Sequence, residues 1–519
     1  MGKFFSKIIS LILFLYVVVS SYQLRWVSDD AFISFRYARN FVNGLGLVFN
    51  EGEKVEGYTN FLWTIIMAIP HYFEIDPVAF SEILGILFFL GTLATLIVFS
   101  NRNREVLQYF PVAFAGLSLH KYSHIFATSG LETSMFTFLV TAGFLTLHFS
   151  KKILFVGGAF FLLVLAVMTR MDGIIFYLVA SAFYFIRLTI FEKAFGKNFS
   201  RVIRGFLFAQ IPFIALLIPY WIIKSMYYGS FFPNTYYAKS ANASYFSQGL
   251  KYFWLYFNSY YVFYLVPFLL LWLVFQNKKK STQQKDASQV EKGSLSLKWL
   301  ILPAVLGYIF YVVKVGGDFM FSRFFIPVTP LLFILLEILI SEISRNSGRL
   351  FIGLSFSIAA STILFFNPYR GKPIPIVEGI SNESEIYRRE SVEKLTEKLK
   401  AWRNIFVESK IKIAFGGAQA IFAYYTESPL AIEAETGLTD YYIAHLPLEK
   451  RGRIGHEKRA PLFYLKARGV HIHLNPPEEL NSPDYKTIRI KAFPGYWKII
   501  NPDVNVMRNL SKQGDFSFE

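Results

Sequence analysis

The chain has 519 residues, is 54% hydrophobic and 18% aromatic, and carries a formal charge of +17. This apolar fraction excludes an ordinary soluble domain, and apolar runs long enough to cross a bilayer recur through the first 366 residues. There are no cysteines, which excludes disulfides, thiolate nucleophiles and cysteine-ligated metals.

The N-terminal run MGKFFSKIISLILFLYVVVSS resembles a signal peptide but has no small-x-small cleavage site, and a polar motif follows it at once. We therefore interpret it as a retained first span. Ten more runs bring the prediction to eleven spans, near 4–22, 77–100, 104–119, 133–150, 153–169, 173–191, 205–224, 252–276, 298–314, 324–342 and 350–366. The run 104–119 is short for a span, and we expect it to be tilted or broken. The run 61–73 is shorter still and indicates an interfacial or re-entrant segment.

Basic residues are concentrated in alternate loops between the predicted spans. These loops carry Arg102, Arg104, Lys151, Lys152, Lys193, Lys197, Arg201, Arg204, Lys278, Lys279, Lys280, Lys285, Arg345 and Arg349. The positive-inside rule places this set of loops, together with the N-terminus, in the cytoplasm. The polar segment 281–297 then forms a cytoplasmic loop. An odd number of spans places the C-terminus outside.

The composition changes after residue 366, which predicts a transmembrane domain at 1–366 and a soluble α/β domain at 367–519. Val392, Leu399 and Trp402 recur at helical spacing and predict an amphipathic helix. The segment 411–437 alternates strand, glycine turn, helix and strand, a βαβ pattern. His471 and His473 lie on one face of a further predicted strand. Because no third ligand is near, the pattern favours a surface strand over a metal site.

Every external loop carries a polar motif that is not simply basic. The motifs are SDDAFISFRYARN (28–40) with NGLGLVFNEGEKVEGYTN (43–60), HKYSHIFATSGLETS (120–134), TRMDG (169–173), YYGSFFPNTYYAK (227–239) and KVGGDFMFSR (314–323). Ionisable groups beside a bilayer are costly and tend to be functional. Acids and cations around one external cavity suit a reaction on a phosphate-linked donor: an acid deprotonates an acceptor hydroxyl, and cations neutralise the departing phosphate.

Each of these residues also has a purely structural interpretation. Asp29 and Asp30 equally suit the first turn of a helix, where acids complement the helix dipole. Glu132 suits a capping box, Asp318 a helix cap, and Lys239 an interfacial lysine. The glycines of NGLGLVFNEGE are typical of turns and not of a phosphate loop.

The stretch DDAFISFRYARN, with VNGLGLVFN and VEGYTN after it, resembles the opening of bacterial GT-C integral-membrane glycosyltransferases. It is most similar to the mycobacterial-type terminal arabinofuranosyltransferase family and its uncharacterised relatives. The resemblance continues in order through SGLETS, TRMDG, PNTYYAK and GGDFMxxR, and then through GLTDYYIA (437–444) and GHEK (455–458). It implies a GT-C fold of about eleven spans and an inverting transferase that uses a polyprenyl-phosphate-linked sugar.

The resemblance also implies roles for individual residues. Asp29 matches the catalytic base, and Asp30 is its catalytic neighbour. The expected substrate-binding positions are Arg36, Tyr58, Glu132, Asp172, Asn234, Lys239, Asp318 and Arg323. Phe321 stands where many relatives have a histidine, so the arabinose specificity is not carried over.

These observations predict a glycosyltransferase that acts on an envelope glycan, lipid or protein acceptor among membrane lipids. We expect it in the bacterial inner membrane, with the N-terminus cytoplasmic and the C-terminal domain periplasmic. We expect no nucleic-acid partner, and a divalent metal is possible. The alternatives are a transporter or flippase of lipid-linked sugars, which would place polar groups near the bilayer midplane, and a glycan-binding protein without catalysis.

Overall fold

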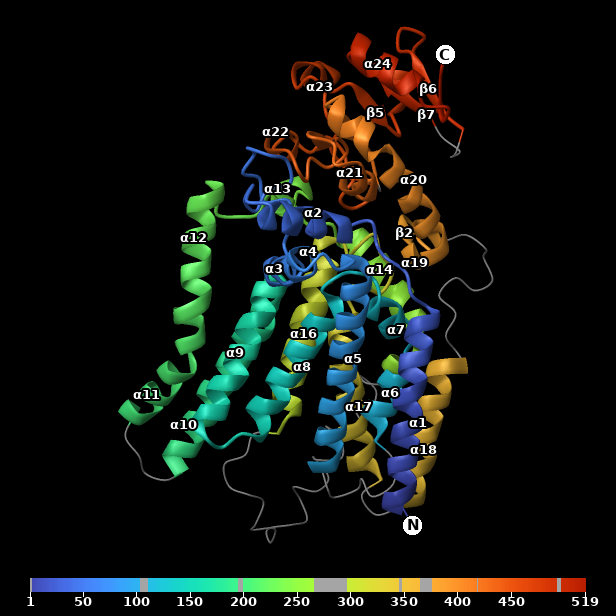
Figure 1. Cartoon of the computed structure of the whole chain (residues 1–519). Helices are drawn as coiled ribbons and strands as arrows, with labels where there is room; N and C mark the ends of the chain where they lie inside the picture. Colours follow the sequence, from blue (N-terminus) through green and yellow to red (C-terminus); the bar gives the residue numbers. More distant parts are fainter. Residues whose placement is uncertain are drawn as a thin grey trace.

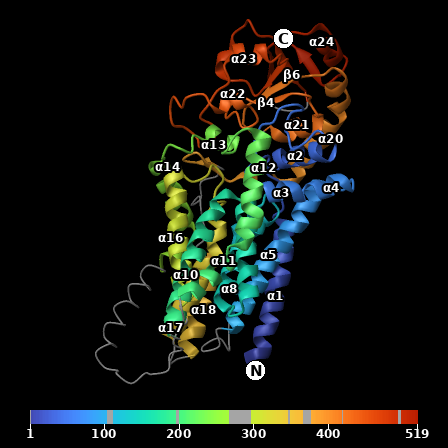
Figure 2. The same ribbon diagram turned by 90° about the vertical axis from the view of Figure 1, so that its left-hand side faces the viewer.

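The structure is a computed structural model that describes residues 2–102, 111–194, 199–265, 296–344, 348–364, 376–417, 419–491 and 496–519. A bundle of long helices carries the N-terminus at its foot, and a mixed unit of strands and helices lies on the opposite end and carries the C-terminus (Figure 1). We call residues 376–519 the C-terminal unit. The ninety-degree view shows the same two layers, so the arrangement is not an effect of one projection (Figure 2).

The bundle consists of long apolar helices that run side by side. They are α1 (Gly2–Gln23), α5 (Pro77–Arg102), α8 (Thr133–Phe149), α9 (Ile153–Thr169), α10 (Ile174–Ala194), α16 (Lys298–Val315), α17 (Thr329–Ile343) and α18 (Gly348–Leu364). Helices α11 (Phe199–Ala209) and α12 (Ile218–Tyr228) are joined by a π-helical turn and bend by 42°. Among the described residues, four helices are long and apolar enough to cross a membrane, or five if the bent pair is one span.

The number of eleven spans remains a prediction. Residues 103–110 and 266–295 lie outside the described part of the chain, and they contain parts of two predicted spans. Of the predicted span 104–119, the structure describes the short helix α6 (Val112–Ser118). The run 61–73 forms two short helices, α3 (Phe61–Ile66) and α4 (Ala68–Tyr72), as expected for a segment too short to span.

Short helices form a layer between the bundle and the C-terminal unit (Figure 1). Besides α3 and α4, this layer includes α2 (Ala31–Val42) and α13 (Asn234–Ala238), and α7 (Lys121–Ala127) and α14 (Phe246–Ser259) lie beside it. Three of the predicted external motifs, at 28–60, 120–134 and 227–239, flank or form these helices, whereas TRMDG and KVGGDFMFSR lie at the ends of the bundle helices α9 and α16. The layer therefore brings together segments that are far apart in the sequence.

The C-terminal unit contains a six-stranded sheet in the order β4-β3-β5-β7-β6-β8. Its strands are β3 (Ile413–Phe415), β4 (Ala431–Glu433), β5 (Ile472–Leu474), β6 (Thr487–Ile490), β7 (Tyr496–Ile499) and β8 (Phe516–Phe518). Strands β3 and β4 pair in parallel across helix α21 (Ala420–Thr426). A hairpin of β1 (Ile376–Val377) and β2 (Ile380–Ser381), then α19 (Glu383–Ile386), precede the sheet. The predicted boundary at 366/367 lies outside the described residues.

Helix α20 (Arg389–Glu408) packs its apolar face against the sheet. Val392, Leu399 and Trp402 recur at helical spacing on this face and are buried. Trp402 meets Trp497 of β7 edge to face, with ring centroids 6.0 Å apart, a preferred aromatic geometry. Three further helices, α22 (Tyr441–Ala444), α23 (Leu462–Ala467) and α24 (Val504–Ser511), complete the unit.

A strand does form around His471 and His473, but the prediction that it lies at the surface is wrong. Strand β5 lies inside the sheet between β3 and β7, and His473 is buried. His473 Nδ1 lies 3.0 Å from the carbonyl oxygen of Leu474, and the backbone N–H of Lys412 donates to His471 Nδ1. Both imidazole rings therefore make polar contacts with the backbone of the sheet and its flanking residues.

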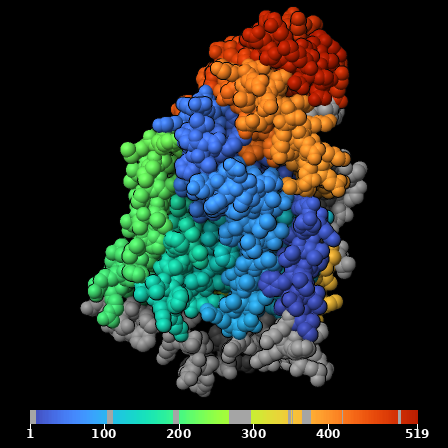
Figure 3. All heavy atoms as spheres, in the orientation of Figure 1, coloured from blue at the N-terminus to red at the C-terminus, as the bar shows by residue number. Residues whose placement is uncertain are grey.

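Polar side chains of the loops and short helices at this end of the bundle bind the main chain of the C-terminal unit. Arg36 donates to the carbonyls of Ala423 and Ser428. The Asn50 side-chain amide both donates to and accepts from the backbone of Ala431, so it continues the ladder at edge strand β4. The filled surface shows the N-terminal segments in direct contact with the C-terminal unit (Figure 3).

Candidate functional site

A polar cavity of about 90 Å³ lies where the loops and short helices at one end of the bundle meet the C-terminal unit. Both parts of the chain contribute ionisable side chains. From the bundle side these are Asp29, Asp30 and Lys239, and from the C-terminal unit Glu383, Glu433, Arg453 and His456. The cavity therefore brings together three of the predicted site residues.

Asp29 precedes α2 and is buried, with 7% of its surface exposed. Its two carboxylate oxygens accept hydrogen bonds from the backbone N–H groups of Ala420 and Ile421, both at 2.9 Å. Burial raises the pKa of Asp29 to about 7, although the two amide donors act to lower it. A carboxylate with a pKa near neutrality suits a general base at physiological pH.

Asp30 is the N-cap residue of α2, and its side chain is 32% exposed. Its carboxylate lies 3.5 Å from Nη1 of Arg323. Arg323 also lies 3.5 Å from Asp318 and 3.6 Å from Glu132. Arg323 is therefore surrounded by three carboxylates, and its charge is largely compensated within the protein.

A buried charge network lies next to this arginine. Arg170 bonds both oxygens of Asp172, at 2.7 and 3.1 Å, and lies 3.2 Å from Glu132. Tyr308 donates to Asp172, and Asn60 donates to Glu132. Burial acts to raise the pKa of Glu132, but Arg323 and Arg170 outweigh it and hold that pKa below its usual value.

This network changes the interpretation of two predicted substrate-binding residues. Glu132 and Asp172 are both buried and bonded to Arg170, and neither lines the cavity. Asp318 is buried as well and pairs with Arg323. The acids of SGLETS, TRMDG and GGDFM thus join the motifs to one another beneath the cavity.

Three other predicted substrate-binding residues also lie outside the cavity lining. Arg36 is bonded to the C-terminal unit as described above. Asn234 donates to the carbonyls of Gly437, Leu438 and Asp440. The Tyr58 hydroxyl lies 3.0 Å from that of Tyr228 in an aromatic cluster. Arg36 and Asn234 thus join the bundle side to the C-terminal unit, whereas Tyr58 packs within the bundle side.

Lys239 is the predicted cation that does line the cavity. It ends α13, and among the described residues no carboxylate lies within 4.0 Å of its ammonium nitrogen. Gly455 of the GHEK segment lies against it, since a Cβ there would stand 3.5 Å from Cε of Lys239. The ammonium group is thus available to an anion in the cavity.

Sequence reasoning missed the cavity residues of the C-terminal unit and Arg170. Arg453 lies 3.2 Å from Ser381 Oγ and 3.5 Å from Glu383, and burial raises the pKa of Glu383. The His456 ring packs edge-on against Phe319 of GGDFM, and burial lowers the pKa of that histidine. Two motifs could have indicated these residues. GHEK contains His456, and TRMDG contains Arg170 beside Asp172, which was the only residue of that motif proposed for the site.

Phe321 occupies the position at which a histidine was expected. Its side chain is 1% exposed and packs edge-on against Tyr122, with centroids 4.6 Å apart. Its backbone N–H donates to the carbonyl of Ser381 in β2. The side chain therefore belongs to an aromatic core and does not line the cavity.

Two glycines explain why the motifs fit together closely. Gly130 of SGLETS has φ +77°, and a Cβ there would meet the Ala31 Cβ of α2 at 2.8 Å. Gly317 of GGDFM has φ +80°, and a Cβ there would lie 2.5 Å from the Tyr252 ring. Only glycine combines this backbone conformation with so close an approach.

The described residues contain no group of three or more His, Cys, Asp or Glu side chains arranged to hold a metal ion. The cavity instead combines carboxylates with cationic side chains. Such a site can bind an anionic group and accept a proton.

Comparisons with known proteins agree with the helical membrane fold described above. No protein-family model matches the chain. It is 26% identical over 371 residues to the terminal β-(1→2)-arabinofuranosyltransferase of Mycobacterium tuberculosis, covering 64% of this chain and 56% of that protein. It is 26% identical over 354 residues to the enzyme of the same name from Corynebacterium glutamicum, covering 60% and 48%. The chain thus spans about half the length of these curated relatives.

Among solved structures, ArnT from Cupriavidus metallidurans bound to undecaprenyl phosphate is similar, with a TM-score of 0.50 and 12% sequence identity. The match covers 83% of this chain and 87% of ArnT. The chain therefore shares the GT-C fold of ArnT, and with its apolar helices it is an integral membrane protein. The resemblance to GT-C proteins and to the terminal arabinofuranosyltransferases is confirmed.

Proposed function

We propose that the protein is a glycosyltransferase that moves a sugar from a polyprenyl-phosphate donor to a hydroxyl of a cell-envelope acceptor. The observation that carries the proposal is the cavity at the end of the bundle, which the buried acid Asp29 and the cation Lys239 both line within a GT-C fold. The relatives' names describe arabinofuranosyl transfer, and ArnT binds undecaprenyl phosphate. The names support sugar transfer, and the ArnT complex supports a polyprenyl-phosphate-linked donor.

In the proposed reaction, the acceptor oxygen forms a bond to the anomeric carbon while the bond from that carbon to the phosphate oxygen breaks. The hydroxyl proton moves to Asp29, and the bonding electrons leave with the polyprenyl phosphate. Attack from the face opposite the phosphate inverts the anomeric configuration. A positioned base contributes about 10²–10⁴-fold to such a step.

The surroundings of Asp29 support this role. Two backbone amides fix its carboxylate, so it needs no reorientation before it accepts a proton. Asp30 is the second candidate, because its carboxylate is more exposed, but its proximity to Arg323 favours an orienting role. We place the reaction on the outer side of a bacterial inner membrane, with the N-terminus cytoplasmic.

Lys239 is proposed to contact the phosphate of the donor. Lys239→Ala is expected to weaken donor binding about 10- to 150-fold, since one charge-assisted hydrogen bond contributes about 1.5–3 kcal/mol. Binding of a polyprenyl-phosphoryl sugar to detergent-solubilised protein measures this loss. Lys251→Ala is the matched control, because Lys251 forms an exposed ion pair with Glu378 away from the cavity. Equal affinity in the two variants would remove Lys239 from the site.

The raised pKa of Asp29 predicts the pH dependence of the reaction. Only the ionised carboxylate accepts a proton, so kcat/KM should rise with pH through an apparent pKa of about 7 and level off above it. Initial rates between pH 5 and 9 test this, with protein integrity followed in the same buffers. A rate independent of pH below 7 would contradict a base with this pKa.

The function itself is tested with purified protein in nanodiscs and a donor labelled in the sugar. A panel should include polyprenyl-phosphoryl arabinofuranose and polyprenyl-phosphoryl hexoses, with envelope extract as acceptor. Transfer of label to the extract, with release of polyprenyl phosphate, supports the proposal. Movement of intact labelled donor between leaflets of proteoliposomes, without transfer, would support the flippase alternative instead.

A further inference from the structure

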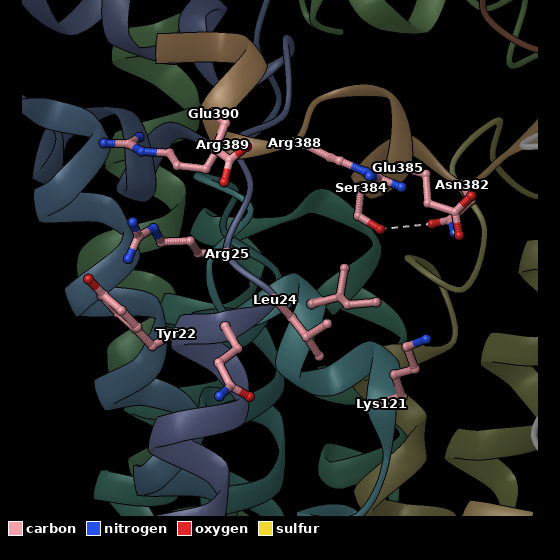
Figure 4. A pocket seen from close by; sticks show the side chains of 12 residues that line it. Tyr22, Leu24, Arg25, Lys121, Asn382, Ser384, Glu385, Arg388, Arg389 and Glu390 are labelled. Carbon is pink, nitrogen blue, oxygen red and sulfur yellow. Dashed lines mark hydrogen bonds between the residues drawn. The ribbon is translucent and has the colours of Figure 1, made fainter.

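A second and larger cavity, of about 540 Å³, lies at the outer end of α1. Its wall combines Tyr22 and Arg25 at the end of α1 and just after it, Lys121 at the start of α7, and Arg388 and Arg389 at the start of α20 (Figure 4). The bundle side and the C-terminal unit each supply part of the wall.

Cationic side chains dominate this wall, and two of them form no ion pair with the described residues, although Arg25 still interacts electrostatically with Glu82. Arg389 is compensated, since it lies within 4.0 Å of Asp76, Glu82 and Glu393. By contrast, in the ranges that the structure describes, no carboxylate lies within 4.0 Å of the guanidinium of Arg25 or of Arg388.

Two acidic side chains also line the cavity. Glu385 and Glu390 are both exposed, and Glu385 accepts a hydrogen bond from Asn382. Neither approaches Arg25 or Arg388 closely enough to form an ion pair. Arg25 and Arg388 lie on different sides of the cavity (Figure 4), and each guanidinium group can form charge-assisted, bidentate hydrogen bonds with a phosphate.

The position of the cavity indicates where the phosphate comes from. Leu15, Val19 and Tyr22 follow one another along one face of α1 and are 59%, 53% and 61% exposed. In a membrane protein, such an apolar stripe faces lipid. It ends at Tyr22, which is itself part of the cavity wall, so acyl chains lying along α1 would bring a headgroup to Arg25.

This cavity is separate from the candidate active site. Asn382 lines the larger cavity, and its neighbour Glu383 lines the smaller one, so the turn at 382–383 forms part of the wall between them. An occupant of the larger cavity would contact the outer face of that turn and both units of the chain, without entering the site at Asp29.

We propose that this cavity binds the phosphate headgroup of an anionic membrane lipid, with Arg25 and Arg388 as its main contacts. The lipid links the end of α1 to the start of α20 and so stabilises the C-terminal unit on the bundle. The site does not depend on the proposed transfer reaction, and it takes a lipid that is not consumed.

The test compares thermal unfolding of the full-length protein in phosphatidylcholine nanodiscs with and without phosphatidylglycerol. Because a ligand that binds only the folded state stabilises it, phosphatidylglycerol should raise the unfolding midpoint by about 2–4 °C. The rise should shrink at high salt, since salt screens exposed charges. In Arg25→Gln/Arg388→Gln the rise should disappear.

The matched control is Arg459→Gln/Arg489→Gln, which removes the same charge from two exposed arginines of the C-terminal unit. This variant should keep the full rise. If the test variant unfolds, native mass spectrometry of each single variant should still show fewer retained phosphatidylglycerol molecules than in the control. No effect of phosphatidylglycerol, or an equal effect in both double variants, would overturn the proposal. The same rise with inorganic phosphate alone would show a free-anion site and overturn the lipid assignment.

Discussion

Asp29→Asn is expected to lower the turnover number at least about a hundredfold while leaving donor affinity nearly unchanged. The substitution keeps the shape of the side chain but removes the group that accepts the acceptor's proton. Single-turnover and steady-state rates with a labelled polyprenyl-phosphoryl sugar measure the loss, and donor binding is measured separately. Asp30→Asn should lose less, because Asp30 acts through Arg323 in this arrangement.

Asp29→Asn also needs a structural control. Both carboxylate oxygens accept backbone N–H groups of the C-terminal unit, and an asparagine would present an NH₂ group to one of them. The unfolding midpoint should therefore be recorded for the variant and compared with that of Asn234→Ala, which weakens the same junction from outside the cavity. A near-normal rate in folded Asp29→Asn would refute the assignment. A larger loss in Asp30→Asn would move the base to that residue.

Arg170→Met is expected to destabilise the protein by about 3–5 kcal/mol, because removing one partner leaves buried charges without compensation. Arg170 is buried and lies between Glu132 and Asp172, which are buried as well. Methionine fills a similar length but supplies no charge and no hydrogen-bond donor. Loss of yield, aggregation in detergent and a large drop in the unfolding midpoint should appear even where no substrate is present.

Arg459→Met provides the comparison, since its pair with Glu479 is exposed on both sides and exposed pairs contribute about 0–1 kcal/mol. Glu132→Gln/Arg170→Met should recover part of the stability, because one of the uncompensated carboxylates becomes neutral. Equal unfolding midpoints for Arg170→Met and the wild-type protein would show that the network does not stabilise the fold.

The alternation of basic loops and polar motifs along the chain predicted that the polar motifs share one side of the membrane; that this side is the external one remains a prediction. The sequence also allowed Asp29, Asp30 and Lys239 to be selected, and these line one cavity in the structure. The amphipathic helix at α20 was readable because apolar residues recur at helical spacing over a long segment. Each of these features depends on a short stretch of sequence or on the number of basic residues in each loop.

The partners of the charged residues could not be predicted, since they depend on contacts between distant segments. Glu132 looked like a substrate-binding or capping acid, and only the structure pairs it with Arg170 and Arg323. Arg453 and His456 lie more than four hundred residues from Asp29 along the chain, and no spacing rule links them to it. Strand β5 was placed correctly, but its central position in the sheet depends on pairing with β3 and β7.

Several polar side chains of the bundle side bind the C-terminal unit through its peptide groups. Arg36 and Asn234 bind carbonyl oxygens, Asp29 binds amide N–H groups, and Asn50 binds both groups of Ala431. Peptide groups are present whatever the side chain, so these contacts constrain the backbone path of the C-terminal unit and not its amino-acid identities. At these positions the side chains of that unit can therefore vary while the contact is kept, whereas the ion pairs Arg39–Glu427 and Arg389–Glu82 do depend on side-chain identity.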